Sequence, residues 1–221
     1  MSTVTKPPLE RVAVYIDGFN LYFGLKDKGW RHFLWLDLPA MAAEMLKPSQ
    51  ELVAVKYFTT RVSYPEESAK RQSTYLDALR VRGGIEIVYG NFIWNPDGCE
   101  TCGATWDRRE EKQTDVNIAV HMLGDAQDGL YDAALLVSAD SDQVPAVKEI
   151  SLRHPQRRVI IACPPARFSD ELVAAASSFF HLKRSIFSRC QLPQLVPDPT
   201  TGYVLCQPTE WWKEPIRAPA T

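Results

Sequence analysis

The sequence lacks an excess of positive charge and any long hydrophobic run. Its 221 residues include 25 lysines and arginines against 27 aspartates and glutamates, which gives a net charge of −2. A protein this close to neutral has no overall positive field, so any nucleic acid must bind at a local basic patch. The longest apolar runs, such as residues 132–139, are too short to cross a bilayer.

A secretory signal and a disulfide framework are also missing. Residues 1–11 are polar, contain two prolines and lack the apolar core of a signal peptide. The five cysteines are an odd number in a sizeable domain, which favours reduced thiols over paired disulfides. We therefore expect a cytoplasmic protein with no membrane-spanning segment.

What the sequence does contain is a regular alternation of two patterns. Short apolar runs rich in β-branched residues predict strands at residues 11–16, 52–60, 85–89, 133–138 and 158–163. Segments with helical periodicity predict helices at residues 37–46, 66–82, 114–123, 143–152 and 169–180. Strands alternating with helices are typical of an α/β fold, here a three-layer sandwich with a mostly parallel central sheet.

One domain, residues 11–190, accounts for these elements. Within it, residues 91–111 break the pattern with a proline, an Asp-Gly pair and a Cys-x-x-Cys motif, and we expect a loop excursion there. Residues 191–221 are rich in proline and predict an irregular C-terminal tail. Its adjacent tryptophans, Trp211 and Trp212, are expected to pack on the body of the protein or on a partner.

Aspartates follow two of the predicted strands. Asp17 comes directly after the first strand, and Asp140 and Asp142 come directly after the fourth. Asp115 lies in the first turn of the helix that leads into the fourth strand. In parallel sheets the ligand site lies beyond the carboxyl ends of the strands. If the first and fourth strands are neighbours, these four carboxylates meet in one crevice.

Such a cluster of carboxylates requires protons or cations. A single pair of like charges ~4 Å apart costs about 4 kcal/mol at an effective dielectric constant near 20. Oxygen ligands favour Mg²⁺ or Mn²⁺ over Zn²⁺. Each aspartate alone is also explained by a turn, a helix N-terminus or a helix cap. Their joint placement at strand ends is what favours a metal site.

Three short blocks of sequence resemble the NYN domain in its LabA-like branch, which belongs to the PIN-like nuclease superfamily. The blocks are Tyr-Ile-Asp-Gly-Phe-Asn at 15–20, Glu-Lys-Gln-Thr-Asp-Val at 111–116 and Val-Ser-Ala-Asp-Ser-Asp at 137–142. They occur in the order and spacing of that family, and the resemblance covers residues 11–190. It implies a Rossmann-like parallel sheet flanked by helices.

The resemblance also implies an activity and a set of site residues. The implied activity is that of a metal-dependent endoribonuclease. Such an enzyme uses Mg²⁺ or Mn²⁺ to activate water for in-line attack on phosphorus. The residues that match the acidic metal site of the family are Asp17, Asp115, Asp140 and Asp142. Asn20 matches its polar residue after the first strand, and Ser138 matches its small hydroxyl residue before the acidic pair.

Two other functions stay open at this point. A catalytically silent RNA-binding or protein-interaction module would have the same fold, although such a module is expected to lose part of the acidic quartet, which is complete here. A phosphate hydrolase of the haloacid dehalogenase type would also have an aspartate after the first strand. It would need a second aspartate two residues after Asp17, where this chain has Phe19.

A small group of basic residues precedes the Asp115 helix. Arg108, Arg109 and Lys112 lie just before it in the sequence, close to several aromatic residues. Basic side chains neutralise phosphates, and exposed aromatic rings stack on unpaired bases. We therefore expect RNA, preferably single-stranded, to contact these three residues; a solvated basic face is the simpler alternative.

Cys99 and Cys102 have the spacing of one half of a zinc site. A structural zinc site needs four ligands, and the sequence has no second Cys-x-x-Cys motif. Two such pairs meeting across the axis of a homodimer would complete a structural Zn²⁺ site, and two reduced thiols in a loop are the alternative. Cys163 falls in a predicted buried strand and is expected in the core.

Overall fold

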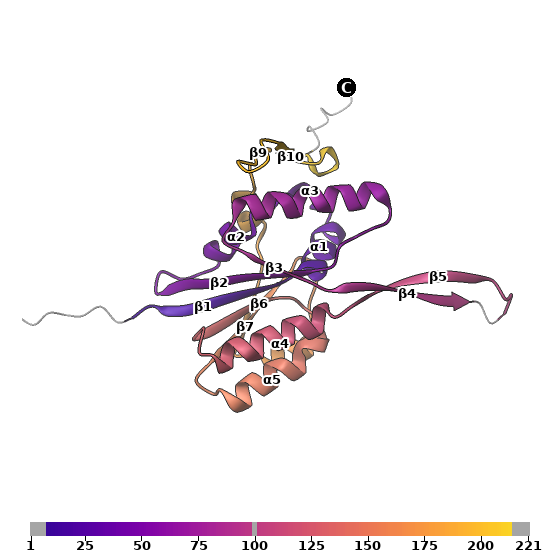
Figure 1. Ribbon diagram of the computed structural model, residues 1–221. Coiled ribbons are helices and arrows are strands. Elements are labelled where there is room, and N and C mark those ends of the chain that lie inside the picture. Colours follow the sequence, from indigo (N-terminus) through magenta and orange to yellow (C-terminus); the bar gives the residue numbers. More distant parts are fainter. Residues whose placement is uncertain (1–7, 99–100, 214–221) are drawn as a thin grey trace, which may run out of the picture.

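A parallel sheet with helices on both faces forms the centre of the molecule (Figure 1). The computed structural model describes residues 8–98 and 101–213, and for residues 93–97 and 106–111 it describes the backbone. The six strands of the sheet lie in the order β3-β2-β1-β6-β7-β8, and all neighbours run parallel. Their bounds are β1 Glu10–Asp17, β2 Gln50–Thr59, β3 Glu86–Tyr89, β6 Ala133–Val137, β7 Arg158–Cys163 and β8 Ser178–His181. The predicted α/β fold is confirmed.

The helices bury a separate core on each face of the sheet. The first face carries α1 Gly18–Asp27, α2 Leu38–Glu44, α3 Glu66–Arg82 and α7 Arg184–Arg189. The second carries α4 Thr114–Gln127, α5 Val144–Arg153 and α6 Asp170–Ala175. Alternate residues of β1 serve the two cores, with Val14 and Ile16 in the first and Tyr15 in the second. Burial of both faces explains why the central strands are continuous apolar runs.

The predicted helix at 169–180 is wrong in its second half. Helix α6 ends at Ala175, because Ala176 takes an extended conformation, and strand β8 follows. Backbone pairing along β7 stabilises this edge strand, with Ile160 opposite Ser178 and Cys163 opposite His181. The aromatic residues of β8 suit a strand better than a helix.

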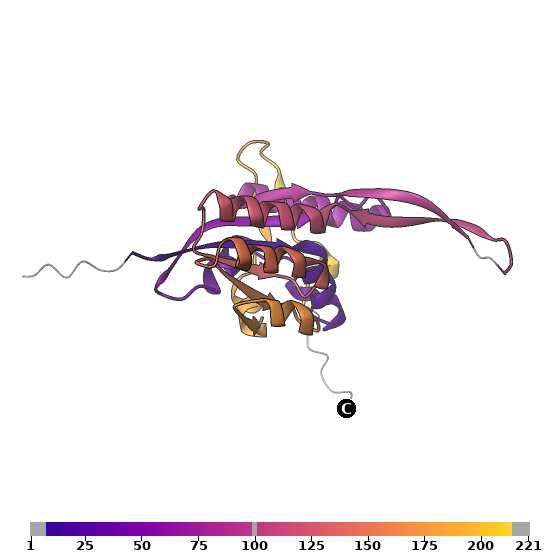
Figure 2. The same cartoon turned by 90° about the horizontal axis from the view of Figure 1, so that it is seen from below.

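The predicted loop excursion at 91–111 is a β-hairpin. Strands β4 Asn91–Gly98 and β5 Thr105–Lys112 pair antiparallel along their whole length, from Asn91 opposite Lys112 to Gly98 opposite Thr105. The hairpin projects well away from the sheet (Figure 2). The two strands pair with each other and form a sheet separate from the central one. None of their described side chains belongs to either core, and their sequence lacks the apolar pattern of the central strands.

The C-terminal tail is also more ordered than predicted. Strands β9 Leu195–Pro197 and β10 Val204–Cys206 form a small antiparallel sheet, followed by the short helix η3 Thr209–Trp211. Trp211 is buried, and its ring lies 5.9 Å edge-to-face from the ring of Tyr75 in α3. Trp212 is 54 % exposed. Trp211 thus packs on the body, whereas Trp212 does not.

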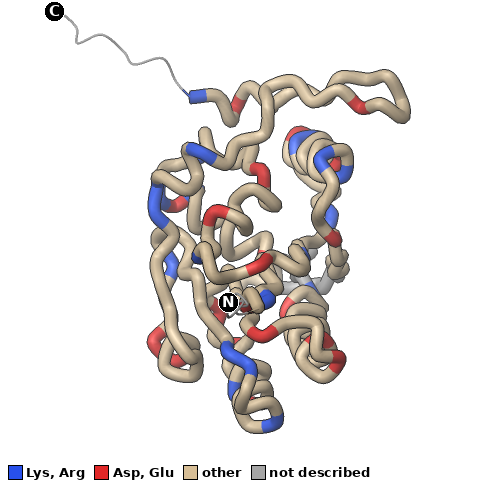
Figure 3. The backbone as a smooth tube through the Cα atoms, turned by 90° about the vertical axis from the view of Figure 1, so that its left-hand side faces the viewer, with Lys and Arg blue, Asp and Glu red and all other residues tan. Residues whose placement is uncertain are grey.

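Charged residues of both signs are interspersed over the elements (Figure 3). Several basic residues that could form patches are paired with acids. Arg157, in the turn between α5 and β7, contacts Asp132 at 2.9 Å, and Arg158 at the start of β7 contacts Glu10, so the charges of these two arginines are largely neutralised. Among the described helices, none has the length and apolar character needed to span a membrane.

Candidate metal centre

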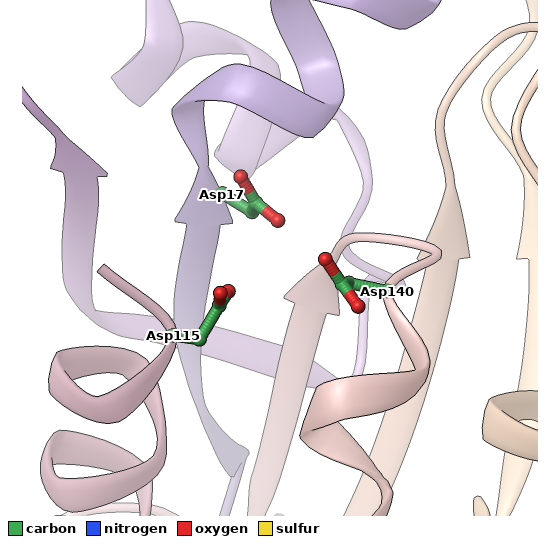
Figure 4. Close-up of side chains that lie close together, drawn as sticks. All are labelled: Asp17, Asp115 and Asp140. Atoms are coloured by element: carbon green, nitrogen blue, oxygen red, sulfur yellow. The ribbon is translucent and has the colours of Figure 1, made fainter. Parts of the chain in front are cut away.

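Three carboxylates converge at the carboxyl edge of the sheet (Figure 4). Strands β1 and β6 are neighbours, with Ile16 opposite Val137, so the residues that follow them lie close together. One oxygen each of Asp17, Asp115 and Asp140 lies within 4.8 Å of the others. Helix α4 starts beside these strand ends and supplies Asp115. We call these three residues the acidic cluster.

Asp17 is the buried member of the acidic cluster, with only 4 % of the residue exposed. One carboxylate oxygen caps helix α1 by accepting the backbone N–H of Asn20 at 3.0 Å. The other oxygen accepts the hydroxyl of Ser138 at 2.9 Å. These two bonds fix the orientation of the carboxylate.

The glycine after Asp17 allows this close turn from strand to helix. A Cβ atom at Gly18 would lie 2.6 Å from the carbonyl oxygen of Phe58 and 2.8 Å from the ring of Tyr57. Both contacts are too short, and the first is to backbone, so α1 could not start where it does with a larger residue. The Asp-Gly pair is therefore a packing requirement of the site as well as a turn signal.

Asp115 is positioned by the start of helix α4. The preceding Gln113 has a left-handed backbone with φ of 78°. The side-chain amide of Gln143 donates to both the carboxylate and the backbone carbonyl of Asp115 at 3.2 Å. Gln143 is buried, so this link ties the start of α4 to the loop that carries Asp140.

The loop after β6 is held by the two polar residues predicted from the resemblance. The hydroxyl of Ser138 accepts the backbone N–H of Asp140 at 3.1 Å while donating to Asp17. The side-chain oxygen of Asn20 accepts the backbone N–H of Ala139 at 3.1 Å. Ser138 and Asn20 therefore join the two strand ends and position the carboxylates.

Asp142 lies outside the acidic cluster. The residue is exposed, and its contact with the site is a backbone N–H that donates to the carboxylate of Asp140 at 3.0 Å. This bond caps the short helix η2 Ser141–Gln143, which turns the chain away after Asp140. The structure thus brings together three of the four predicted aspartates.

Burial, together with smaller contributions from the nearby carboxylates of Asp115 and Asp140, raises the pKa of Asp17 to about 7. The hydrogen bonds from Asn20 and Ser138 oppose this shift, because they stabilise the ionised form. Near neutral pH the group is thus balanced between a bound proton and a negative charge. A divalent cation would replace that proton and remove the repulsion.

The acidic cluster opens into a cleft of about 200 Å³. Its lining also includes Phe19, Phe23 and Arg167. Arg167 pairs with Asp27 at 2.5 Å, and its Nε is buried with no hydrogen-bond partner among the described residues. No motif in the sequence marks this arginine as a site residue, although it follows β7 at the same edge of the sheet.

The other predicted site residues lie on or near the hairpin. Arg108 and Arg109 belong to β5, and their side chains lie outside the described part of the structure. Lys112 is exposed at the end of β5, next to the start of α4. Cys99 lies outside the described residues, and Cys102 is exposed near the hairpin tip. Cys163 is buried in β7, as expected.

Comparisons with known proteins agree with this architecture. The chain is 28 % identical over 249 aligned residues to 6-hydroxy-3-succinoylpyridine 3-monooxygenase HspA of Pseudomonas putida (strain DSM 28022 / S16), with 93 % of this chain and 76 % of that protein covered. Its fold is similar to the crystal structure of VPA0982, a protein of unknown function from Vibrio parahaemolyticus RIMD 2210633. That match has a TM-score of 0.57 at 21 % identity and covers 86 % of this chain and 100 % of the other.

The family assignment comes from the sequence itself. The family model described as the NYN domain matches residues 11–183. That span contains the six-stranded sheet except for Glu10, the first residue of β1, together with the hairpin and all three residues of the acidic cluster. A PIN-like nuclease fold is consistent with this match and with the topology. The chain therefore belongs to the NYN domain family.

Proposed function

We propose that this protein is a metal-dependent ribonuclease that hydrolyses phosphodiester bonds of RNA at the acidic cluster. The observation that carries the proposal is the convergence of Asp17, Asp115 and Asp140 within 4.8 Å, one of them buried. Three carboxylates with no nearby nitrogen or sulfur ligand in the described group suit Mg²⁺ or Mn²⁺. Membership of the NYN family supports the same activity.

The residues of the cleft would have different roles in such a reaction. Asp17, Asp115 and Asp140 would hold the metal, which when bound lowers the pKa of water and offsets charge on the leaving oxygen. Ser138 and Asn20 keep the carboxylates in place through the bonds described above. Arg167 lines the same cleft and would neutralise a non-bridging phosphate oxygen of the substrate.

We propose further that the substrate is single-stranded RNA and that it contacts the cleft and the hairpin. Phe23 lines the cleft and is 39 % exposed, so part of its ring is accessible to an unpaired base. Lys112 is exposed beside the start of α4, and we retain Arg108 and Arg109 on β5 as further phosphate contacts. A backbone-tracking site of this kind binds many sequences with similar affinity.

The test is cleavage of an end-labelled, unstructured RNA by the purified protein with Mn²⁺ or Mg²⁺. We expect activity that EDTA abolishes and that Asp115→Asn reduces by at least about 100-fold, since loss of groups that support a metal already costs 10–100-fold. Asp128→Asn is the matched control, because Asp128 is exposed at the opposite end of the same helix. Metal-independent cleavage, or equal losses in both variants, would contradict the proposal.

A second candidate function comes from the relative in Pseudomonas putida, which is named as a monooxygenase of a hydroxypyridine. One observation favours it, an apolar pocket of about 170 Å³ beside the acidic cluster. The donor set does not favour it, because non-haem iron oxygenases use two histidines and one carboxylate. Consumption of 6-hydroxy-3-succinoylpyridine with oxygen and a reduced nicotinamide, followed by chromatography, would test this activity.

A further inference from the structure

An apolar pocket lies between α1 and α3, next to the acidic cleft. It has a volume of about 170 Å³, and most of its lining is apolar. Its aromatic wall residues are Phe19, Tyr22, Phe23, Tyr57, Tyr75 and Trp211. Neither the acidic cluster nor the metal chemistry proposed above accounts for this pocket.

The C-terminal segment closes one side of this pocket. Trp211 is buried against Tyr75, and the neighbouring Glu210 pairs with Arg71 of α3 at 2.8 Å. Arg71 also donates to the hydroxyl of Ser68 at 3.0 Å. Residues beyond the NYN match thus complete a cavity whose other walls belong to the NYN domain.

The pocket and the acidic cleft are adjacent to each other. Phe19 and Phe23 line both of them. The ring of Tyr57 also lies directly against Gly18, the residue after Asp17. A molecule with one end in the pocket therefore has only these shared residues to cross before its other end reaches the acidic cluster.

The size and walls of the pocket indicate what fits. An engineered apolar cavity of about 150 Å³ remains dry and binds one benzene molecule. A pocket of 170 Å³ therefore suits one six-membered ring better than a fused purine. Stacking on aromatic walls contributes about 1–3 kcal/mol per base in complexes with single strands.

The polar residues of the lining suit a ring that carries a carbonyl oxygen. The side-chain amide of Gln72 is held in place, since it accepts the backbone N–H of Val62 at 2.6 Å and donates to the carbonyl of Thr60 at 2.9 Å. Arg71 has five N–H donors and uses two nitrogens in its bonds to Glu210 and Ser68. The remaining donors of Arg71 suit a carbonyl acceptor.

We infer that this pocket binds a single six-membered heteroaromatic ring with a carbonyl substituent, while the rest of the same molecule reaches the acidic cluster. The ring is either a pyrimidine base of an RNA strand or a free heteroaromatic compound. A pyrimidine base as the ligand rests on the proposed ribonuclease function, whereas the binding of a ring in this pocket does not.

The test is calorimetric titration of the full chain in EDTA with uridine, adenosine and 2-pyridone. Uridine binding at least about tenfold tighter than adenosine, a difference of 1.4 kcal/mol, supports a pyrimidine base. Binding of 2-pyridone without uridine supports a free compound. Failure of both single-ring probes, or adenosine binding as tightly as uridine, overturns the inference. Because no metal is present, these results are independent of whether the protein cleaves RNA.

Two variants locate the binding. Ser68→Phe fills the pocket from α3 and is expected to weaken the binding of the ring probe at least about tenfold. Lys70→Phe adds the same side chain at an exposed position of the same helix outside the lining, and it should bind like the wild type. If Ser68→Phe does not fold, Val62→Phe fills the pocket from the loop before α3. Unchanged binding in a folded filling variant overturns the inference.

Discussion

Asp17 combines burial with two neighbouring negative charges, and this combination makes its protonation state part of the folding equilibrium. Its pKa rises from an ordinary value of 3.8 to about 7 in the folded protein. Between these values the unfolded chain has released the proton while the folded chain still holds it. The folded state therefore loses stability as the pH rises from about 4 to about 7, and at higher pH this full loss persists without further change.

The corresponding prediction concerns metal-free protein. Its melting temperature should fall between pH 4 and pH 7, and Asp17→Asn should flatten that dependence and melt higher than the wild type at pH 7.5. The effect is at most about 4 kcal/mol, because each pKa unit corresponds to 1.36 kcal/mol. Thermal melts in EDTA across this range provide the measurement. A variant that melts well below the wild type at every pH would show that Asp17 is mainly structural.

Two aspartates separated by one residue should respond differently to the same substitution. Asp140 belongs to the acidic cluster, whereas Asp142 is exposed and contacts it through its backbone. We expect Asp140→Asn to lower the RNA cleavage rate at least about 100-fold and Asp142→Asn to lower it less than about threefold. Rates at saturating RNA and Mn²⁺ check this. Comparable losses would place the Asp142 side chain in the site after all.

The strand-end aspartates were predictable, and Arg167 was not, for a physical reason. A carboxylate directly after an apolar strand has few structural roles, so its position carries information about a site. Arg167 follows β7 after a proline-rich turn and pairs with Asp27, which is distant in the sequence. Only the folded packing of α1 against this turn brings the arginine into the cleft.

Among the strands, those buried on both faces were the easiest to predict from the sequence. Strands β1 and β6 are covered on both faces, so their sequences are continuously apolar and easily recognised. Strand β8 lies at the edge of the sheet and has four residues, too few for a clear period. Strand β5 is highly charged, because the hairpin projects away from both cores and is stabilised by its own backbone pairing.

The hairpin arginines carry a prediction about RNA affinity. Replacing Arg108 and Arg109 together with alanine should weaken binding by a similar factor for any sequence. The log–log salt dependence should flatten by about 0.7 for each lost phosphate contact on a single strand. Cleavage at saturating RNA should persist, because the acidic cluster is unchanged. Affinity across a salt series gives the answer, and an unchanged slope would remove these arginines from the RNA-binding surface.

The C-terminal segment carries a prediction about stability. Trp211→Ala removes a buried ring that packs on α3 and should reduce the free energy of unfolding by about 3–5 kcal/mol. Trp212→Ala is the control, since Trp212 is 54 % exposed and should change stability by less than about 1 kcal/mol. Urea denaturation of both variants measures the difference. Equal, small effects would mean that this segment is only loosely attached.

At the scale of the whole molecule, two cores share one sheet, and the acidic cluster lies where they meet. Asp17 caps α1 on the first face, and Asp115 begins α4 on the second. The parallel topology could be predicted from the alternation of strands and helices. The neighbouring position of β1 and β6, which determines the site, could be expected only from the family resemblance and the aspartates themselves.

This arrangement means that a bound cation would link the end of β1 to two segments that follow it about a hundred or more residues later in the sequence. Ligand binding stabilises a protein only in conformations where the site is intact, by about 2.7 kcal/mol at a concentration 100 times the dissociation constant. Mn²⁺ should thus slow amide hydrogen exchange together at the end of β1, the start of α4 and the loop after β6. In Asp115→Asn this joint protection should disappear, since opening of any one segment would no longer be linked to the other two.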